Sequence, residues 1–172
     1  MKKLLLTIFC VSLLIAEKEN INFRHITVEK DGLSESSVYD IFQDSNGFIW
    51  ITTDNGLDKY DGYTIKQYQH LYDDTTSISQ GQGSAIYEDK KGNIWASTKD
   101  GKINRLNPET EKFTKFPVYQ IEDAQLGGNL DKISEDEMGH IWCLDGSLTR
   151  INIKTNERKY FYAKDSAYTQ NF

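Results

Sequence analysis

Three aspartates with similar surroundings are the first candidates for chemistry in this sequence. Asp44, Asp89 and Asp136 stand in the phrases QDSNGFIW (43–50), EDKKGNIW (88–95) and EDEMGHIW (135–142). Such carboxylates could serve catalysis or bind Ca²⁺, but DSNG lacks the Glu that an EF-hand loop carries at its twelfth position. We therefore predict that each carboxylate caps its own turn, because Asp side chains accept hydrogen bonds from nearby backbone N–H groups. The glycines of these turns are Gly47, Gly92 and Gly139.

Two variable loops, 69–83 and 117–129, hold a second set of polar and aromatic side chains. Aromatic faces beside carboxylates and amides suit carbohydrate ligands, although solvated loops have the same composition. The candidate ligand-binding residues are Tyr72, Asp73, Asp74, Gln82, Tyr119, Glu122, Asp123, Gln125 and Asn129. A propeller glycosidase or lyase would need converging groups such as two carboxylates, and Asp54 with Asp73 is only a weak pair. The sequence predicts no catalytic residue, no metal site and no cofactor.

The three phrases also mark an internal repeat, since their tryptophans lie 45 and 47 residues apart. A period in the forties, with a Gly turn before a short apolar strand, is typical of β-propeller blades. Successive strand residues face opposite sides of a sheet, so neighbouring Ile and Trp residues indicate a sheet that is buried on both faces. We assign Trp50, Trp95 and Trp142 to the core in preference to sugar-stacking platforms.

Each repeat carries the signals of four strands. Asn-Gly or Asp-Gly pairs at 55–56, 100–101 and 145–146 predict tight hairpins. We predict an all-β chain, a partial β-propeller of about three four-stranded antiparallel blades near 38–68, 84–116 and 131–162. An opening strand is expected at 21–27, the start of a linker to a fourth blade at 163–172, and essentially no helix beyond the N-terminal segment. The recurrent cations Lys59, Arg105 and Arg150 suit solvated or inter-blade ion-pair positions better than substrate contact.

Residues 1–16 form a segment of their own. Two lysines precede an apolar run, Leu4–Ala16, that is short for a membrane span, which is the layout of a secretory signal peptide; an uncleaved anchor is the alternative. Its removal leaves Cys143, which we interpret as a buried inert thiol in a strand. The net charge of −6 and the lack of a Lys/Arg cluster argue against nucleic acid or an anionic membrane surface as partners.

The stretch DGLSESSVYDIFQDSNGFIWITTDNGLDKYDG (31–62) closely resembles the two-component regulator propeller repeat, and the resemblance covers about residues 22–162. It departs at Thr52, where the family more often has Gly. The resemblance implies the exported sensor region of a hybrid histidine kinase of the kind found in gut Bacteroidetes-type bacteria. Such a sensor typically recognises oligosaccharides. It has further blades, a membrane span and a cytoplasmic kinase.

Three repeats are too few to close a ring of four to eight blades. We interpret 17–172 as the N-terminal part of a periplasmic, oligosaccharide-responsive sensor propeller whose parent protein resides in the inner membrane. The chain itself has no kinase domain and is predicted not to be an enzyme. Its expected partners are an oligosaccharide and either the remaining blades or further copies of itself. A structural or protein-interaction propeller is the alternative.

Overall fold

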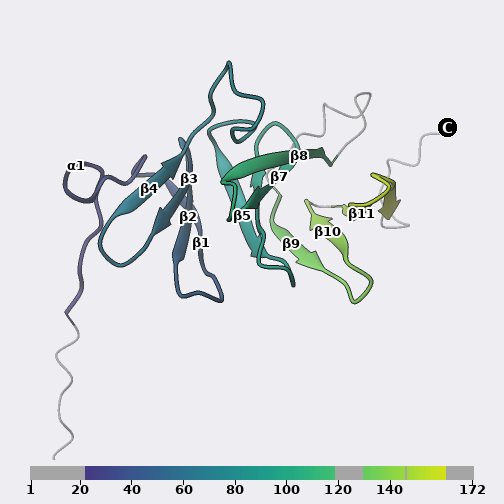
Figure 1. Cartoon of the computed structure of the whole chain (residues 1–172), viewed down its shortest axis with the longest axis horizontal. Coiled ribbons are helices and arrows are strands. Elements are labelled where there is room, and N and C mark those ends of the chain that lie inside the picture. The colour runs from purple at the N-terminus through teal and green to yellow at the C-terminus, as the bar shows by residue number, and fades with distance from the viewer. Residues whose placement is uncertain (1–21, 119–129, 146, 162–172) are drawn as a thin grey trace, which may run out of the picture.

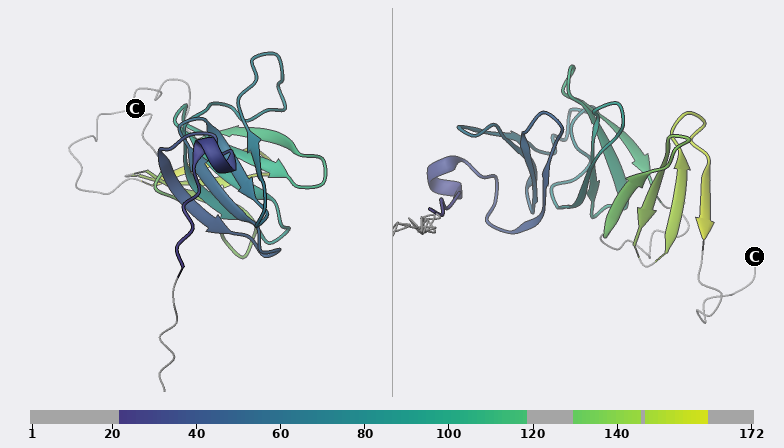
Figure 2. Two further views of the ribbon diagram at one scale, coloured as in Figure 1. Left: turned by 90° about the vertical axis from the view of Figure 1, so that its left-hand side faces the viewer. Right: turned by 90° about the horizontal axis from the view of Figure 1, so that it is seen from below.

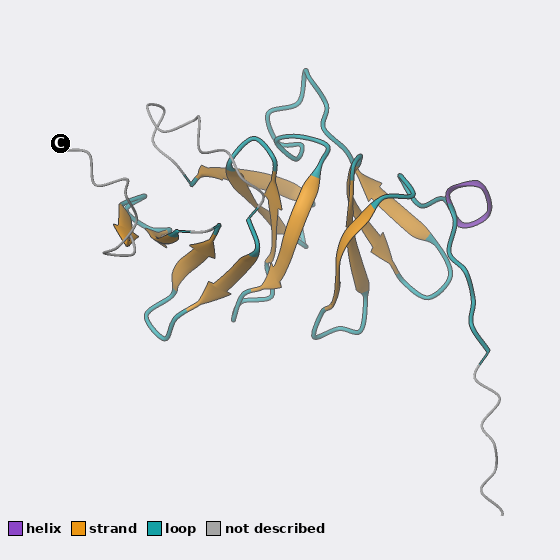
Figure 3. Cartoon of the chain, turned by 180° about the vertical axis from the view of Figure 1, so that it is seen from behind, coloured by secondary structure: helices purple, strands orange, loops and turns teal. Residues whose placement is uncertain are grey.

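The computed structural model describes residues 22–118, 130–145 and 147–161. They fold into three four-stranded antiparallel sheets that stand side by side as blades (Figures 1 and 3). The predicted all-β fold of partial-propeller type is confirmed.

Each blade is an up-and-down meander whose strands pair in chain order. Blade 1 consists of β1 (Val38–Gln43), β2 (Ile49–Thr53), β3 (Gly56–Tyr60) and β4 (Ile65–Tyr68). Blade 2 consists of β5 (Gly83–Glu88), β6 (Ile94–Thr98), β7 (Lys102–Asn107) and β8 (Lys112–Pro117). Blade 3 consists of β9 (Lys132–Glu135), β10 (His140–Leu144), β11 (Leu148–Asn152) and β12 (Arg158–Phe161). The first strands approach one another, since β5 contacts both β1 and β9 (Figure 2).

The core lies between the blades, one apolar layer for each pair. Trp50 of blade 1 packs among Ile86, Ile94 and Leu106 of blade 2, and Trp95 of blade 2 packs in the same way on blade 3. Trp50 and Trp95 are 1% and 0% exposed, so both are core residues. Cys143 is a buried free thiol in the second layer, and burial raises its pKa to about 12, which keeps it protonated and unreactive.

Each phrase aspartate connects its turn to the tryptophan six residues later. Asp44 Oδ1 accepts from the backbone N–H groups of Asn46 and Phe48, while Oδ2 accepts from Trp50 Nε1 at 2.8 Å. The same Asp–Trp bond is 2.9 Å long in blade 2 and 3.0 Å in blade 3. The carboxylate therefore fixes the turn and orients the buried indole at the same time.

The hydrogen bonds to the third phrase aspartate, Asp136, favour its ionised form. Burial alone would raise the pKa of Asp136, but hydrogen bonds from Trp142 Nε1 and from the backbone and ring of His140 outweigh it and hold that pKa well below its usual range. The group is thus a fixed anion that serves its own turn.

The recurrent cations lie over the aromatic rings. Lys59 Nζ is 3.7 Å from the centroid of the Phe48 ring, and the Arg105 guanidinium is 5.7 Å from that of Trp95. Arg150 lies 6.0 Å from the Trp142 ring in the same way. Lys59 Nζ also lies 5.4 Å from the centroid of the Trp50 ring, so each recurrent cation makes a cation–π contact with the phrase tryptophan of its own blade, a role that the strand pattern alone did not indicate.

The N-terminal part differs from the expectation. Residues 22–27 form no strand, and Val28–Asp31 is a four-residue helix, α1, capped by Thr27 and ended by Gly32 at φ 79°. A strand needs an edge to pair with, and no described edge pairs with this segment; Arg24 instead binds Asp31 and the Tyr60 hydroxyl. The expected signal peptide (1–16) and the linker at 163–172 lie outside the described residues.

Candidate functional site

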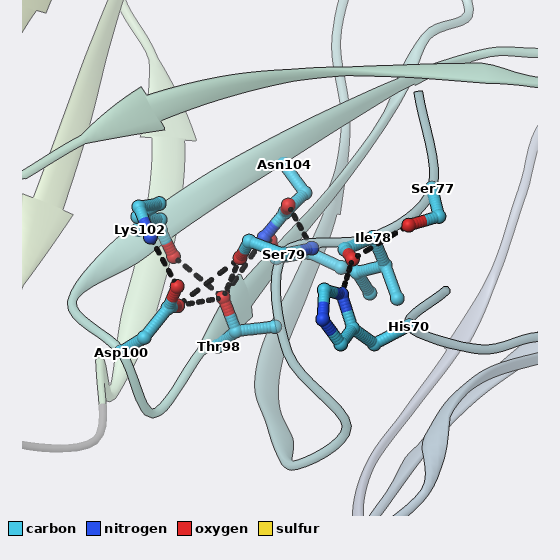
Figure 4. A network of polar contacts seen from close by, with 9 residues as sticks. His70, Ser77, Ile78, Ser79, Thr98, Asp100, Lys102 and Asn104 are labelled. Carbon is cyan, nitrogen blue, oxygen red and sulfur yellow. Dashed lines mark hydrogen bonds and ion pairs between the residues drawn. The ribbon is translucent and has the colours of Figure 1, made fainter. Parts of the chain in front are cut away.

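The linkers that lead into β1 and β5 are held by side chains of the second and third strands of the same blade, β2 and β3 in blade 1 and β6 and β7 in blade 2. In blade 2, Ser79 N–H donates to Asn104 Oδ1 at 2.9 Å, and the hydroxyls of Ser79 and Thr98 lie 2.7 Å apart (Figure 4). Asp100 accepts from the Thr98 hydroxyl and pairs with Lys102. Ile78, next to the anchor, is fully buried.

Blade 1 repeats this anchor with an acid in place of the amide. Ser34 N–H donates to Asp58 Oδ2 at 2.7 Å, and its hydroxyl lies 2.7 Å from that of Thr53. Leu33 of the DGLS motif is buried as Ile78 is. The motif therefore fixes the end of the linker to the blade.

The acid is the less favourable choice at this position. Asp58 is fully buried, and its Oδ1 has no hydrogen-bond partner among the described residues. Asn104 uses the corresponding nitrogen to donate to Ala96 O and Thr98 Oγ1. Burial raises the pKa of Asp58, with the hydrogen bonds from Ser34 opposing the shift.

We expect Asp58→Asn to stabilise the chain by about 1–2 kcal/mol at pH 7, because a buried unpaired acceptor becomes a paired donor. A native pKa above the unfolded value means that wild-type stability falls as the pH rises from about 4 through the native pKa. The gain should therefore be larger at pH 7 than at pH 4, as measured by thermal melts at both values. An equal gain at the two pH values would contradict the raised pKa of Asp58. A loss of stability would contradict the view that an amide suits this position better than an acid.

Three predicted ligand residues lie in the first half of the linker 69–83. Tyr72 is 95% exposed and rests edge-on against the His70 ring, with the centroids 4.9 Å apart. Asp73 is exposed. Asp74 accepts from the hydroxyl and backbone N–H of Thr76, and these bonds lower its pKa. Asp74 is therefore a turn residue, whereas Tyr72 and Asp73 are free to meet a ligand.

The fourth, Gln82, belongs to a cluster at the start of the innermost strands. Tyr39 on β1 donates its hydroxyl to Asp54 Oδ1 at 2.7 Å and accepts from Gln82 Nε2 at 2.8 Å. The bond to Asp54 raises the pKa of Tyr39, so its hydroxyl stays protonated. We call Tyr39, Asp54 and Gln82 the rim cluster.

A hollow of about 250 Å³ opens beside the rim cluster, where the three blades meet. Its lining consists of Tyr39, Asp40, Ser84, Leu130 and Asp131. Asp40 accepts from Ile86 N–H, and Ser84 donates to Leu130 O, so hydrogen bonds between blades shape the walls. The lining contains two carboxylates and no cation among the described residues.

Sequence reasoning found part of this site. Asp54 and Gln82 were candidates, for different chemistries, and the structure joins them through Tyr39; no described contact brings Asp73 to Asp54. Sequence reasoning missed Tyr39, Ser84 and Asp131. They lie at or next to the starts of strands, where residues were assigned to the scaffold and not to a binding site. The one available signal was the residue type of Tyr39, an aromatic ring with a polar hydroxyl; the structure then shows this side chain 44% exposed. The candidates Tyr119, Glu122, Asp123, Gln125 and Asn129 lie outside the described residues.

The described side chains include no group of three or more His, Cys, Asp or Glu residues arranged to hold a metal ion. No helix in the described ranges is both long and apolar enough to cross a membrane. The rim cluster offers hydrogen-bonding groups and the aromatic face of Tyr39, and the carboxylates of the adjoining hollow add negative charge.

The repeats match a known family profile. The family described as "two component regulator propeller" matches residues 32–55 and 84–100, which cover the phrases of blades 1 and 2. These two segments are similar to two-component regulator propeller repeats. A histidine kinase of Formosa agariphila is 48% identical over 64 residues, which are 37% of this chain and 5% of that protein.

Solved structures show the same architecture. The extracellular domain of a protein described as a hybrid two-component system of B. thetaiotaomicron superimposes with a TM-score of 0.67 and 25% identity, over 81% of this chain and 20% of that one. Virginiamycin B lyase of Staphylococcus aureus gives a TM-score of 0.59 at 16% identity, over 76% of this chain and 42% of the lyase, which reflects the fold alone. The chain spans 5% of the length of the histidine kinase and 20% of the extracellular domain of the hybrid two-component system.

Proposed function

We propose that these blades belong to the extracytoplasmic ligand-sensing propeller of a hybrid two-component sensor and carry out no catalysis themselves. The repeat family and the likeness to the extracellular domain of a hybrid two-component system support the assignment. On this proposal residues 1–16 export the chain to the periplasm. Anchoring in the inner membrane and phosphoryl transfer then belong to parts of the sensor outside this chain.

The proposed ligand is an oligosaccharide, and the rim cluster is the observation that carries this choice. A tyrosine whose hydroxyl is already oriented by Asp54 and Gln82 presents its ring and the remaining polar atoms in a fixed geometry. Prealigned groups lose little conformational entropy on binding. Asp40 and Asp131 line the adjoining hollow, so neutral sugars should be accepted and anionic ones repelled.

Tyr39→Phe tests this assignment. The substitution keeps the ring and removes the hydroxyl that joins Asp54 to Gln82, so we expect about tenfold weaker binding of a neutral oligosaccharide, about 1.4 kcal/mol. The measurement is isothermal titration calorimetry of the chain against a panel of neutral and uronic-acid oligosaccharides. Tyr72→Phe is the matched control, because it removes the hydroxyl of a 95% exposed tyrosine that is not part of the rim cluster.

Three outcomes would contradict the proposal in different ways. Weaker binding in Tyr72→Phe alone would place the site at the turn that carries Tyr72, away from the rim cluster. An absence of binding to every sugar in the panel would favour the structural or protein-interaction propeller. Cleavage products in the same samples, separated by chromatography, would contradict the non-catalytic assignment.

A further inference from the structure

A second hollow, of about 210 Å³, lies between the last strands of blades 1 and 2. Its walls include Lys66 and Tyr68 on β4, Leu71 in the linker that follows, Glu111 just before β8 and Phe113 on β8. The described residues that line it are all different from those that line the hollow beside the rim cluster. We call this second hollow the outer hollow.

The linker beside the outer hollow is held in place by its own hydrogen bonds and by β8. Leu71 N–H donates to Ser77 Oγ at 3.1 Å, within the linker. Thr76 O accepts from Phe113 N–H of β8 at 2.8 Å. The outer hollow is therefore preformed, and a ligand that enters it does not have to order its walls.

Three residues of the outer hollow carry a charge or a hydroxyl that their counterparts at the interface of blades 2 and 3 lack. The pairs of counterparts, by strand register or turn position, are Lys66 and Thr114, Tyr68 and Phe116, and Glu111 and Asn156. Both aromatic residues of this set pack against the tryptophan of their own blade, so that packing does not require the Tyr68 hydroxyl. The contact between two blades therefore does not by itself call for these three polar groups.

Glu111 also adopts a backbone conformation that its residue type disfavours. Its φ is 56°, in the left-handed region, and the corresponding turn of blade 3 has Asn156 at 60°. Both residues donate their N–H to the carbonyl four residues earlier, so the two turns are alike. Asn tolerates this region, whereas Glu rarely occupies it. Such strain is typical of residues whose side chains serve a function. The Glu111 carboxylate accepts from Lys66 Nζ and, at 3.3 Å, from the Tyr68 hydroxyl.

The ion pair between Lys66 and Glu111 can be exchanged for contacts to a ligand. The two side chains are 52% and 48% exposed, and exposed ion pairs contribute little to stability. The hydrogen bond from Lys66 lowers the pKa of Glu111, so this carboxylate is ionised at neutral pH. Asp74 adds a second carboxylate to the lining. The outer hollow thus offers an ammonium, two carboxylates and the apolar side chains of Leu71 and Phe113.

We propose that the outer hollow binds a free α-amino acid with an apolar side chain, in its zwitterionic form. The ligand carboxylate binds the Lys66 ammonium and the Tyr68 hydroxyl, the ligand ammonium binds Glu111, and the ligand side chain packs against Leu71 and Phe113. A simple anion or cation would meet a group of like charge, whereas a zwitterion satisfies both signs. Binding at the outer hollow is separate from the proposed oligosaccharide site and does not depend on it.

Isothermal titration calorimetry of the chain with L-leucine, L-methionine and L-phenylalanine tests the proposal. The amino acid that binds is then compared with its N-acetyl derivative, which lacks the ammonium, and with its amide, which lacks the carboxylate. We expect each derivative to bind at least about tenfold more weakly, because each loses a hydrogen bond between charged groups.

Glu111→Asn separates a role in binding from a role in holding the blades together. It removes the carboxylate and installs the residue that blade 3 has in the same backbone conformation. We expect the affinity for the amino acid to fall at least about tenfold, while Tm stays equal or rises because the strain is relieved. Tyr68→Phe installs the residue of blade 2 and should weaken binding about threefold. Glu109→Gln, an exposed change in the turn of Glu111 but outside the lining, is the matched control and should alter neither quantity.

Several results would overturn the proposal. The absence of binding by all three amino acids at millimolar concentration would show that the outer hollow is not such a site. Equal binding of the N-acetyl or amide derivative would exclude recognition of a zwitterion. A lower Tm with unchanged affinity in Glu111→Asn would assign Glu111 to the contact between the blades, and weaker binding in Glu109→Gln would place the site outside the outer hollow.

Discussion

Trp95→Ala should lower the free energy of unfolding by about 3–5 kcal/mol, the cost of removing a large aromatic residue from a packed core. Its indole is 0% exposed, packs against Phe116 with the ring centroids 5.3 Å apart, and lies in the layer between blades 2 and 3. The variant loses this packing and leaves the Asp89 carboxylate without its indole donor. Chemical denaturation followed by circular dichroism measures the change.

The repeat supplies the internal comparison for this variant. Trp142→Ala removes the same side chain from blade 3, where it is partly exposed, so we expect a clearly smaller loss. Tyr63→Ala is the control for removal of an aromatic residue from the surface, because Tyr63 is 87% exposed. Equal losses for Trp95→Ala and Tyr63→Ala would mean that the inter-blade layers do not hold the fold together.

The fold could be predicted because the same strand and turn signals occur in each of the three repeats. The Ile–Trp pairs predicted sheets that are buried on both faces, and the Asn-Gly or Asp-Gly pairs predicted the hairpins; both follow from strand geometry alone. Blade 1 was expected from about residue 38, where β1 begins. The opening strand at 21–27 was the exception, because a strand depends on a partner edge that no local pattern reports.

The candidate site was harder to predict because it depends on how the blades lie against one another. Tyr39 and Gln82 are 43 residues apart in the sequence, and only the packing of β5 beside β1 brings them together. Loop composition selected Gln82 as a candidate ligand-binding residue, but it did not indicate the hydrogen bond to Tyr39 that places Gln82 in the rim cluster. It did not separate Asp74, whose carboxylate serves its own turn, from the exposed Asp73 next to it. Lys59 was expected to be solvated or ion-paired because its charge is evident from the sequence. Its contact with the Phe48 ring depends on the folded structure and could not be predicted from the residue type.

Asp89→Ala should have the second large effect, about 3 kcal/mol, although it removes only one small side chain. The buried carboxylate accepts from the backbone N–H groups of Lys91 and Asn93, from Asn93 Nδ2 and from Trp95 Nε1. Hydrogen bonds to a charged group contribute about 1.5–3 kcal/mol each, and a buried donor left unpaired costs about 1–3 kcal/mol. Water can satisfy the turn N–H groups, so most of the loss should come from the indole N–H.

Asp89→Asn separates these two contributions. Its amide oxygen can still accept from the turn, but its NH₂ group would face Trp95 Nε1–H, which is also a donor. If the turn carries the energy, this variant should be close to wild type; if the Asp–Trp bond carries it, as we expect, it should lose nearly as much as Asp89→Ala. Asp136→Ala is the matched variant in blade 3, where the carboxylate is 28% exposed and Trp142 is partly exposed, and its loss should be smaller. A larger loss at Asp136 than at Asp89 would contradict the view that burial of the Asp–Trp pair sets its contribution to stability.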